Sequence, residues 1–249
     1  MDRPRRPGAH LVVAFEWGPT GAAAVVTPGT VAVVVDVLSF TTTLTVAVER
    51  GMTVHPFRWK DERATAYAEQ RGAVLASGRS RGEGVSLSPV SVRAATGVER
   101  LVLPSPNGSS ICFGLADSGA TVVGASLRNA TAVARWVVDA RRPVAVVAAG
   151  ERWPDGSLRP AVEDLWGAGA VLAALVDLGA DELTPEARVA EQAFRAVRPR
   201  LAEELRACTS GRELVDLGFG GDVDVAAELD DASVVPVLVG DAFVAGVAP

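Results

Sequence analysis

The sequence predicts an α/β protein: a layered, mostly parallel sheet covered by helices, with a helical C-terminal portion and short closing strands. Short Val-rich runs alternate with helical stretches along the chain, which is the pattern of successive β-α units. These runs are continuously apolar, as expected where helices cover both faces of a parallel sheet. The 249 residues, 49% of them hydrophobic, suffice for a core in a single domain spanning residues 1–249.

The predicted elements follow one another in a regular order. Strands are predicted at residues 31–38, 53–57, 73–76, 100–104, 121–125 and 143–150. Helices are predicted at residues 42–49, 61–71, 109–116 and 127–140. Residues 161–217 read as mostly helical, either as a layer or as a small second unit. Residues 233–239 and 242–246 are predicted as strands that extend an edge of the sheet. The loops at 77–91 and 149–160 exceed a usual connection of about 4–6 residues, which favours a functional role.

Charge and composition exclude several classes of partner. The 24 basic and 30 acidic side chains give a net charge of −6, so no basic excess is present to neutralise a nucleic-acid backbone. Asp36 interrupts the longest apolar run, and no stretch is long enough to cross a membrane. The apolar run at 11–15 is too short for the core of an export signal. Two distant cysteines fit neither a disulfide framework nor a zinc site, so we expect a cytoplasmic protein.

Small and polar residues follow four of the predicted strands and precede helices. Ligands of open parallel sheets bind at such strand ends, where hydroxyls and free backbone N–H groups can hold an anion. The same residue types are also ordinary helix caps, and each loop taken alone leaves both interpretations open. The loops contain Ser39 to Thr43, Ser105 to Ser110, Ser126 to Asn129, and Gly150 with Glu151.

Asp36 is the strongest single candidate, because a carboxylate at the end of an apolar strand needs a metal, a cation or N–H donors. Glu163 and Asp164 begin the helical stretch that follows, where the helix dipole alone would favour acidic residues. A cap role for Asp36 and a dipole role for the other two therefore stand as alternatives to metal binding or catalysis.

Four short motifs, in the same order, resemble those of the 2-phosphosulfolactate phosphatase family between about Val31 and Val239. Asp36-Val37-Leu38-Ser39-Phe40-Thr41-Thr42 is similar to the family's D-x-L-R-A-T-[TS], and Ser105-Pro106-Asn107-Gly108-Ser109 to its T-T-N-G-T. Ala125-Ser126-Leu127-Arg128-Asn129 is similar to G-S-x-x-N. Ala149-Gly150 followed by Ala161-Val162-Glu163-Asp164 and Ala168-Gly169 is similar to A-G leading to S-x-E-D-x-x-x-A-G.

The resemblance implies an α/β phosphatase that uses Mg²⁺ to release phosphate from 2-phospho-3-sulfolactate or a similar small phosphorylated hydroxy acid. It implies catalytic roles for Asp36 and Glu163, and Mg²⁺ binding by Asp36, Glu163 and Asp164. The implied substrate-binding residues are Thr41, Thr42, Arg79, Arg81, Asn107, Gly108, Ser109, Ser126 and Asn129. Whether water or Asp36 itself attacks phosphorus is left open.

The chain departs from the family pattern at two places. Ser39 stands where the family has an arginine, and Ser77-Gly78-Arg79 replaces its G-E-R, which removes a carboxylate. A non-catalytic anion-binding relative is therefore the alternative to an enzyme. An aspartyl-phosphate phosphatase of the D-x-D type is disfavoured, because its second Asp would fall at Leu38. The expected partner is the small anionic substrate, and a symmetric homodimer is the base-rate expectation.

Overall fold

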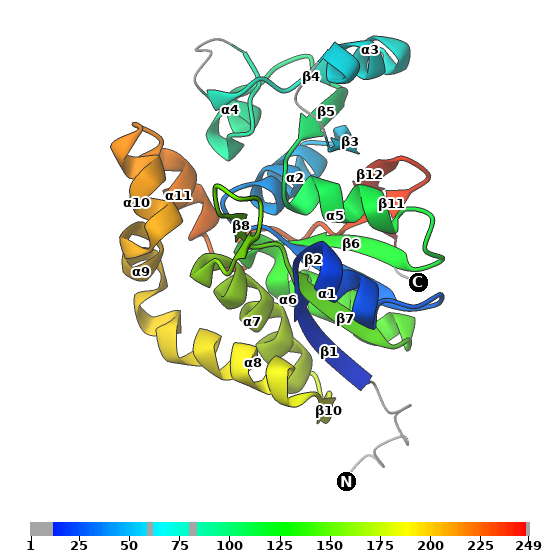
Figure 1. Cartoon of the computed structure of the whole chain (residues 1–249), viewed down its shortest axis with the longest axis vertical. Helices are drawn as coiled ribbons and strands as arrows, with labels where there is room; N and C mark the ends of the chain where they lie inside the picture. The colour runs from blue at the N-terminus through cyan, green and yellow to red at the C-terminus, as the bar shows by residue number, and fades with distance from the viewer. Residues whose placement is uncertain (1–11, 59–61, 80–83, 248–249) are drawn as a thin grey trace, which may run out of the picture.

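The computed structural model describes residues 12–58, 62–79 and 84–247, in which helices cover both faces of one large sheet (Figure 1). Within these residues ten strands form the sheet, in the order β10-β1-β7-β2-β6-β11-β12-β3-β5-β4. They are β1 (Val12–Trp17), β2 (Val31–Val35), β3 (Thr53–Phe57), β4 (Val74–Leu75), β5 (Arg100–Pro104), β6 (Thr121–Ala125), β7 (Val144–Ala148), β10 (Glu182–Leu183), β11 (Pro236–Val239) and β12 (Ala242–Ala245). A separate hairpin joins β8 (Glu151–Arg152) to β9 (Leu158–Arg159). The layered α/β prediction is confirmed.

The sheet consists of two parallel groups that run in opposite directions. The strands β10, β1, β7, β2 and β6 pair in parallel, and so do β3, β5 and β4. The antiparallel hairpin of β11 and β12 joins the groups, because β11 pairs with β6 and β12 with β3. The closing strands, which were predicted at an edge, therefore lie inside the sheet, where each is hydrogen-bonded to a strand on both sides. This correction depends on long-range pairing that no local pattern records.

The strand bounds follow the apolar runs closely. Residues 53–57, 100–104 and 121–125 are strands as predicted, and the run 31–38 ends at Val35 because Asp36 begins a turn. The other predicted strands are one to three residues shorter at one or both ends. The strand β1 was missed, since the run at 11–15 was considered only as an export signal. It pairs with β7 along five residues, from Val13 with Val144 to Trp17 with Ala148.

The helices occupy the intervals between strands. They are α1 (Gly18–Val25), α2 (Phe40–Glu49), α3 (Glu62–Arg71), α4 (Pro89–Ala94), α5 (Gly108–Leu115), α6 (Ala130–Ala140, preceded by a 3₁₀ turn at Leu127–Asn129), α7 (Val162–Asp177), α8 (Pro185–Val197), α9 (Leu201–Ala207), α10 (Thr209–Asp216) and α11 (Gly220–Ala226). Helices α7 to α10 fall in the stretch 161–217 that was predicted to be mostly helical. The single-domain organisation stays a prediction.

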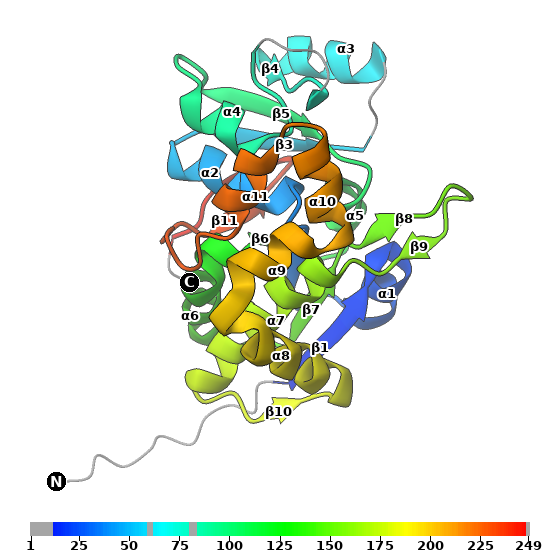
Figure 2. The same ribbon diagram turned by 90° about the vertical axis from the view of Figure 1, so that its left-hand side faces the viewer.

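The strand β2 contributes to the core on both of its faces. Val33 and Val35 join the apolar cluster that includes α6, α7 and α8, whereas Ala32 and Val34 join the cluster of α2 and α5. All five residues of β2 are buried, which explains its continuously apolar sequence. In Figure 2 the helices α9, α10 and α11 lie in front of the sheet, and α11 contacts α4. Val223 and Ala226 of α11 belong to the same apolar cluster as Val35, so a helix near the end of the chain joins the core that includes β2.

The contact between α7 and the end of β2 gives a stability prediction. A Cβ added at Gly167 would lie 2.5 Å from Val37 Cγ2 and 2.8 Å from Val35 Cγ1, and both valines are buried and stiff. We expect Gly167→Ala to lower the free energy of unfolding by about 1–3 kcal/mol through overpacking. Urea denaturation measures it. Gly114→Ala in α5, whose Cβ meets nothing within 4 Å, is the matched control. An equal effect of both substitutions would contradict this packing.

Candidate functional site

The loop after β2 holds Asp36 in a buried position with donors from two segments. Asp36 is 5% exposed. The Gly108 amide at the start of α5 donates to Oδ2 at 2.8 Å, and the Phe40 amide at the start of α2 donates to Oδ1 at 3.2 Å. Ser105 Oγ lies 3.4 Å from Oδ2. The N-termini of two helices thus converge on one carboxylate, which their backbone N–H groups stabilise.

Gly108 is required at this contact because its backbone approaches Asp36 directly. A Cβ at position 108 would lie 2.7 Å from each of Asp36 Cβ, Asp36 Oδ2 and Phe40 Cδ1. Asn107 precedes Gly108 and is the N-cap residue of α5, yet its side chain makes no cap hydrogen bond. Its amide Nδ2 instead donates to Glu151 Oε2 at 2.8 Å. The capping interpretation therefore does not account for Asn107.

Glu163 and Asp164 lie in the first turn of α7 and are both buried. Asp164 accepts the Val37 amide at Oδ1, 2.7 Å away, and the Gly150 amide at Oδ2, 2.8 Å away. It therefore clamps the loop after β2 to the loop after β7. Burial raises the pKa of Asp164 well above its usual range, and the charges of Asp36 and Glu163 raise this pKa further.

The pKa of Asp36 is raised in a similar way. Burial raises its pKa, the amides of Gly108 and Phe40 oppose this effect, and the charge of Glu163 adds to it. The charges of Asp36, Glu163 and Asp164 thus disfavour one another at one end of β2. Such an arrangement is typical of a site that receives a cation or handles protons.

Glu151 is the site residue that sequence reasoning missed. It begins β8, and Ala149 and Gly150 separate it from the end of β7. Burial, together with the charge of Asp36, raises the pKa of Glu151 to about 7. The strand-end rule had placed it among the candidate loops, but a single carboxylate in a long loop carries no further signal. Its contact with Asn107 is visible only in the fold.

Most of the predicted substrate-binding hydroxyls have internal partners. Thr41 Oγ1 accepts the Asp36 amide at 2.9 Å and donates to the Asp36 carbonyl at 2.8 Å. Thr42 and Ser109 donate to the carbonyls of Val37 and Phe57. Ser126 and Asn129 form a reciprocal capping box, as the capping interpretation predicted. These groups stabilise the loops, and a role for them in substrate binding stays a prediction.

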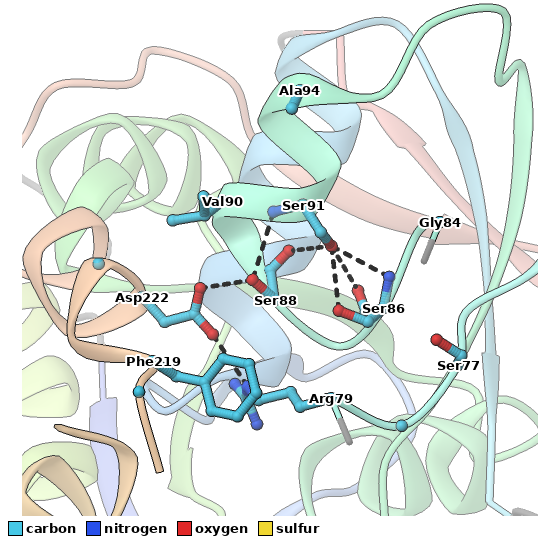
Figure 3. Close-up of a pocket in the computed structure, with 13 residues that line it drawn as sticks. Ser77, Arg79, Gly84, Ser86, Ser88, Val90, Ser91, Ala94, Phe219 and Asp222 are labelled. Carbon is cyan, nitrogen blue, oxygen red and sulfur yellow. Dashed lines mark hydrogen bonds and ion pairs between the residues drawn. The ribbon is translucent and has the colours of Figure 1, made fainter. Parts of the chain in front are cut away.

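Arg79 contacts the loop of Asp36 at Ser39 and is paired with Asp222. Its Nε donates to Asp222 Oδ2 at 2.9 Å (Figure 3). Its Nη2 donates to the hydroxyl of Ser39. Its guanidinium therefore reaches the position where the family motif has an arginine. Arg81, the second predicted anion-binding arginine, lies outside the described residues.

Two cavities open near these groups. One of about 370 Å³ lies beside Asn107 and Glu151 and is bounded by Pro19 and Thr20 of α1 and by the β8–β9 hairpin. The other, of about 310 Å³, is lined by Arg79, Ser88 and Asp222 together with other residues of the segment 77–94 and of 218–222. Both lie close to the loop that carries Asp36. Asn107, beside the first cavity, precedes Gly108, whose amide donates to Asp36. Arg79, in the wall of the second, donates to Ser39.

The carboxylates fit Mg²⁺ by chemistry rather than as a preformed cage. Among residues 12–58, 62–79 and 84–247, no three His, Cys, Asp or Glu side chains gather closely enough to hold a metal by themselves. Mg²⁺, however, is usually bound by one or two carboxylates, with water and substrate phosphate completing its shell. The acidic set around Asp36 meets that smaller requirement, since its oxygens are hard ligands and its charges disfavour one another.

Comparison with known proteins decides the family. Residues 21–241 match the model of the 2-phosphosulpholactate phosphatase family. The chain belongs to this family. A relative from Deinococcus radiodurans is 35% identical over 224 residues, covering 87% of this chain and 91% of its own. Relatives from Symbiobacterium thermophilum (31%; 84% and 91% covered) and Carboxydothermus hydrogenoformans (30%; 82% and 84% covered) are also similar. Each of the three is described as a probable 2-phosphosulfolactate phosphatase.

Family membership confirms the resemblance seen in the sequence and the enzyme class, a hydrolase of phosphoric monoesters. In the part of the chain that the structure describes, no helix has the length and apolar character needed to span a bilayer.

The raised pKa of Glu151 predicts a pH dependence of stability. Because the folded pKa, about 7, exceeds the ordinary value of 4.5, the folded state binds more protons between these values. Stability contributed by this group is thus present below pH 4.5 and lost as pH rises through 7. We expect the melting temperature in EDTA to fall over this window, and to fall less in Glu151→Gln. Glu186→Gln, on the exposed side of α8, is the control; identical profiles for Glu151→Gln and the wild type would contradict the assignment.

Proposed function

We propose that this protein is a Mg²⁺-dependent phosphatase that releases phosphate from 2-phospho-3-sulfolactate or a closely similar phosphorylated hydroxy acid. The observation that carries the proposal is the buried Asp36 carboxylate, held by two helix N-termini beside Glu163. The names of the similar proteins support the substrate. The acidic set supports the metal, since carboxylate oxygens are the hard ligands that Mg²⁺ prefers.

In the proposed site, Asp36 and Glu163 hold the metal. When bound, Mg²⁺ neutralises charge on the phosphoryl oxygens, the electrostatic part of phosphoryl transfer. Asp164 was predicted as a third ligand, and it also clamps the loops after β2 and β7, because its two oxygens accept the amides of Val37 and Gly150. The ligand role of Asp164 stays a prediction that its clamping contacts leave untested.

The remaining groups orient and exchange protons. The Gly108 and Phe40 amides fix the direction in which Asp36 points, so the carboxylate is preorganised before substrate binds. Glu151, with a pKa of about 7, holds or releases a proton at its carboxyl group near neutral pH. Asn107 orients that carboxyl group at Oε2. Both water and Asp36 stay open as the nucleophile.

The cellular setting follows from the thiols. Cys112 and Cys208 are buried and free, and burial raises the pKa of Cys208 to about 12, which keeps it protonated and unreactive. We infer a reducing compartment, the cytoplasm, from this pair. A homodimer stays a prediction.

Asp36→Asn tests the proposed function. Asparagine keeps an acceptor for the Gly108 amide and has the shape of aspartate, so we expect the fold to persist. We expect phosphate release from racemic 2-phosphosulfolactate in Mg²⁺ to fall by at least about a thousandfold, as for loss of a group essential to the reaction. Asp139→Asn, at an exposed position of α6, should leave the rate unchanged.

The same assay separates an enzyme from a binding relative. Wild-type protein that binds phosphate or Mg²⁺, as seen by thermal shift, but hydrolyses neither 2-phosphosulfolactate nor other phosphorylated hydroxy acids would overturn the proposal. Release that persists in EDTA would overturn the metal requirement alone.

A metal-binding prediction needs no substrate. Because Mg²⁺ would neutralise carboxylates that disfavour one another, we expect it to raise the melting temperature of the wild type at pH 7. Glu163→Gln should reduce this shift, whereas Asp139→Asn should preserve it. An equal shift in all three proteins would place the metal elsewhere.

A further inference from the structure

The cavity beside Ser39 contains a buried ion pair that the chemistry at Asp36 does not require. Asp222, in the first turn of α11, is 2% exposed. One of its oxygens accepts from Arg79 Nε and the other from the hydroxyl of Ser88 (Figure 3). A carboxylate buried so deeply needs such partners, and a charged acceptor forms hydrogen bonds about twice as strong as neutral ones. The C-terminal helices thereby fix an arginine from a distant loop.

The position of that arginine is set along one edge of its guanidinium, where two nitrogens have partners. Nε faces Asp222, while Nη2 donates to Ser39, which follows Asp36 by three positions. The guanidinium carbon lies 5.8 Å from the centroid of the Phe219 ring. A guanidinium is a rigid planar fork, so holding one edge determines where the remaining N–H donors point. Arg79 is also one of the residues that line the cavity.

We propose that Asp222 is a positioning residue: it orients Arg79 to bind a second anionic group of the substrate, a carboxylate or sulfonate, in this cavity. The proposal rests on the phosphatase function proposed above. A phosphorylated hydroxy acid carries such a group a few atoms from its phosphate, and an arginine fork matches it better than a point charge does. Asp222 also balances the charge of Arg79 when no anion is bound.

The test compares two substrates in four proteins: wild type, Asp222→Ala, Asp222→Asn and Arg79→Ala. We expect Asp222→Ala to raise KM for 2-phosphosulfolactate about tenfold, the equivalent of one charge-assisted hydrogen bond, with kcat nearly unchanged. Asp222→Asn keeps one acceptor and should recover most of the loss. KM for p-nitrophenyl phosphate, which has no second anionic group, should not change.

The control is Asp224→Asn. Asp224 lies on the same helix, but it is exposed and pairs with Arg206, so KM for both substrates should stay at the wild-type value. A melting curve for each variant shows whether it is folded.

The double variant tests whether Asp222 acts through Arg79. If it does, Arg79→Ala/Asp222→Ala should bind 2-phosphosulfolactate no more weakly than Arg79→Ala alone. Additive losses, a fall in kcat, or equal losses for p-nitrophenyl phosphate would overturn the positioning role.

Failure of the proposed function has a different signature, because the wild type would then release no phosphate from either substrate. Stabilisation by 3-sulfolactate in a thermal shift assay still tests the inference in that case. It should appear in the wild type and be lost in Arg79→Ala and Asp222→Ala, and an equal shift in all three would overturn it.

Discussion

The site depends on how the buried Asp36 carboxylate is held, and the hydrogen bond from the Gly108 amide is the shorter of its two backbone contacts. A carboxylate that leaves water at the end of an apolar strand is costly unless donors replace the water. Here one donor comes from the helix that follows, and the other comes from α5, which belongs to the oppositely directed group of strands. The approach leaves no room for a Cβ at position 108. The β11–β12 hairpin, which turns the sheet direction between β6 and β3, is therefore part of what brings the two loops together.

The acidic set around Asp36 works against stability. The charge of Glu163 raises the pKa values of Asp36 and Asp164. The charge of Asp36 raises the pKa values of Asp164 and Glu151. Backbone amides offset a part of this cost for Asp36 and Asp164, but the structure of the described residues shows no arginine hydrogen-bonded to either carboxylate. Unfavourable charge concentrated at a strand end is typical of a functional site, where stability is exchanged for the ability to bind a cation or move a proton.

The local elements of this structure could be predicted from the sequence, whereas most of the contacts between distant segments could not. The runs at 100–104 and 121–125 are strands because apolar residues bounded by turn formers specify them locally. Asp36 was identifiable because a carboxylate at the end of an apolar run is an anomaly at the level of sequence. The interior place of β11 and β12, the pairing of β1 with β7, and the contact of Asn107 with Glu151 depend on residues 44 or more positions apart. Local sequence preferences do not report such long-range contacts. In the same way, only the folded structure shows which Ser and Thr side chains in the loops are helix caps and which have other partners.

The substitution of serine for arginine at position 39 shows why the whole chain is needed to interpret the site. Considered as a motif, Ser39 removes a cation from the loop of Asp36. In the fold, Arg79 donates to the hydroxyl of Ser39, so the cation is supplied from a different segment. A long side chain from a loop loses rotamer entropy when it is fixed in one place, and the buried Asp222 on α11 offsets this cost. The hydrogen bond from Arg79 to Ser39 thus joins the Arg79–Asp222 pair to the loop of Asp36, and it makes α11 part of the site.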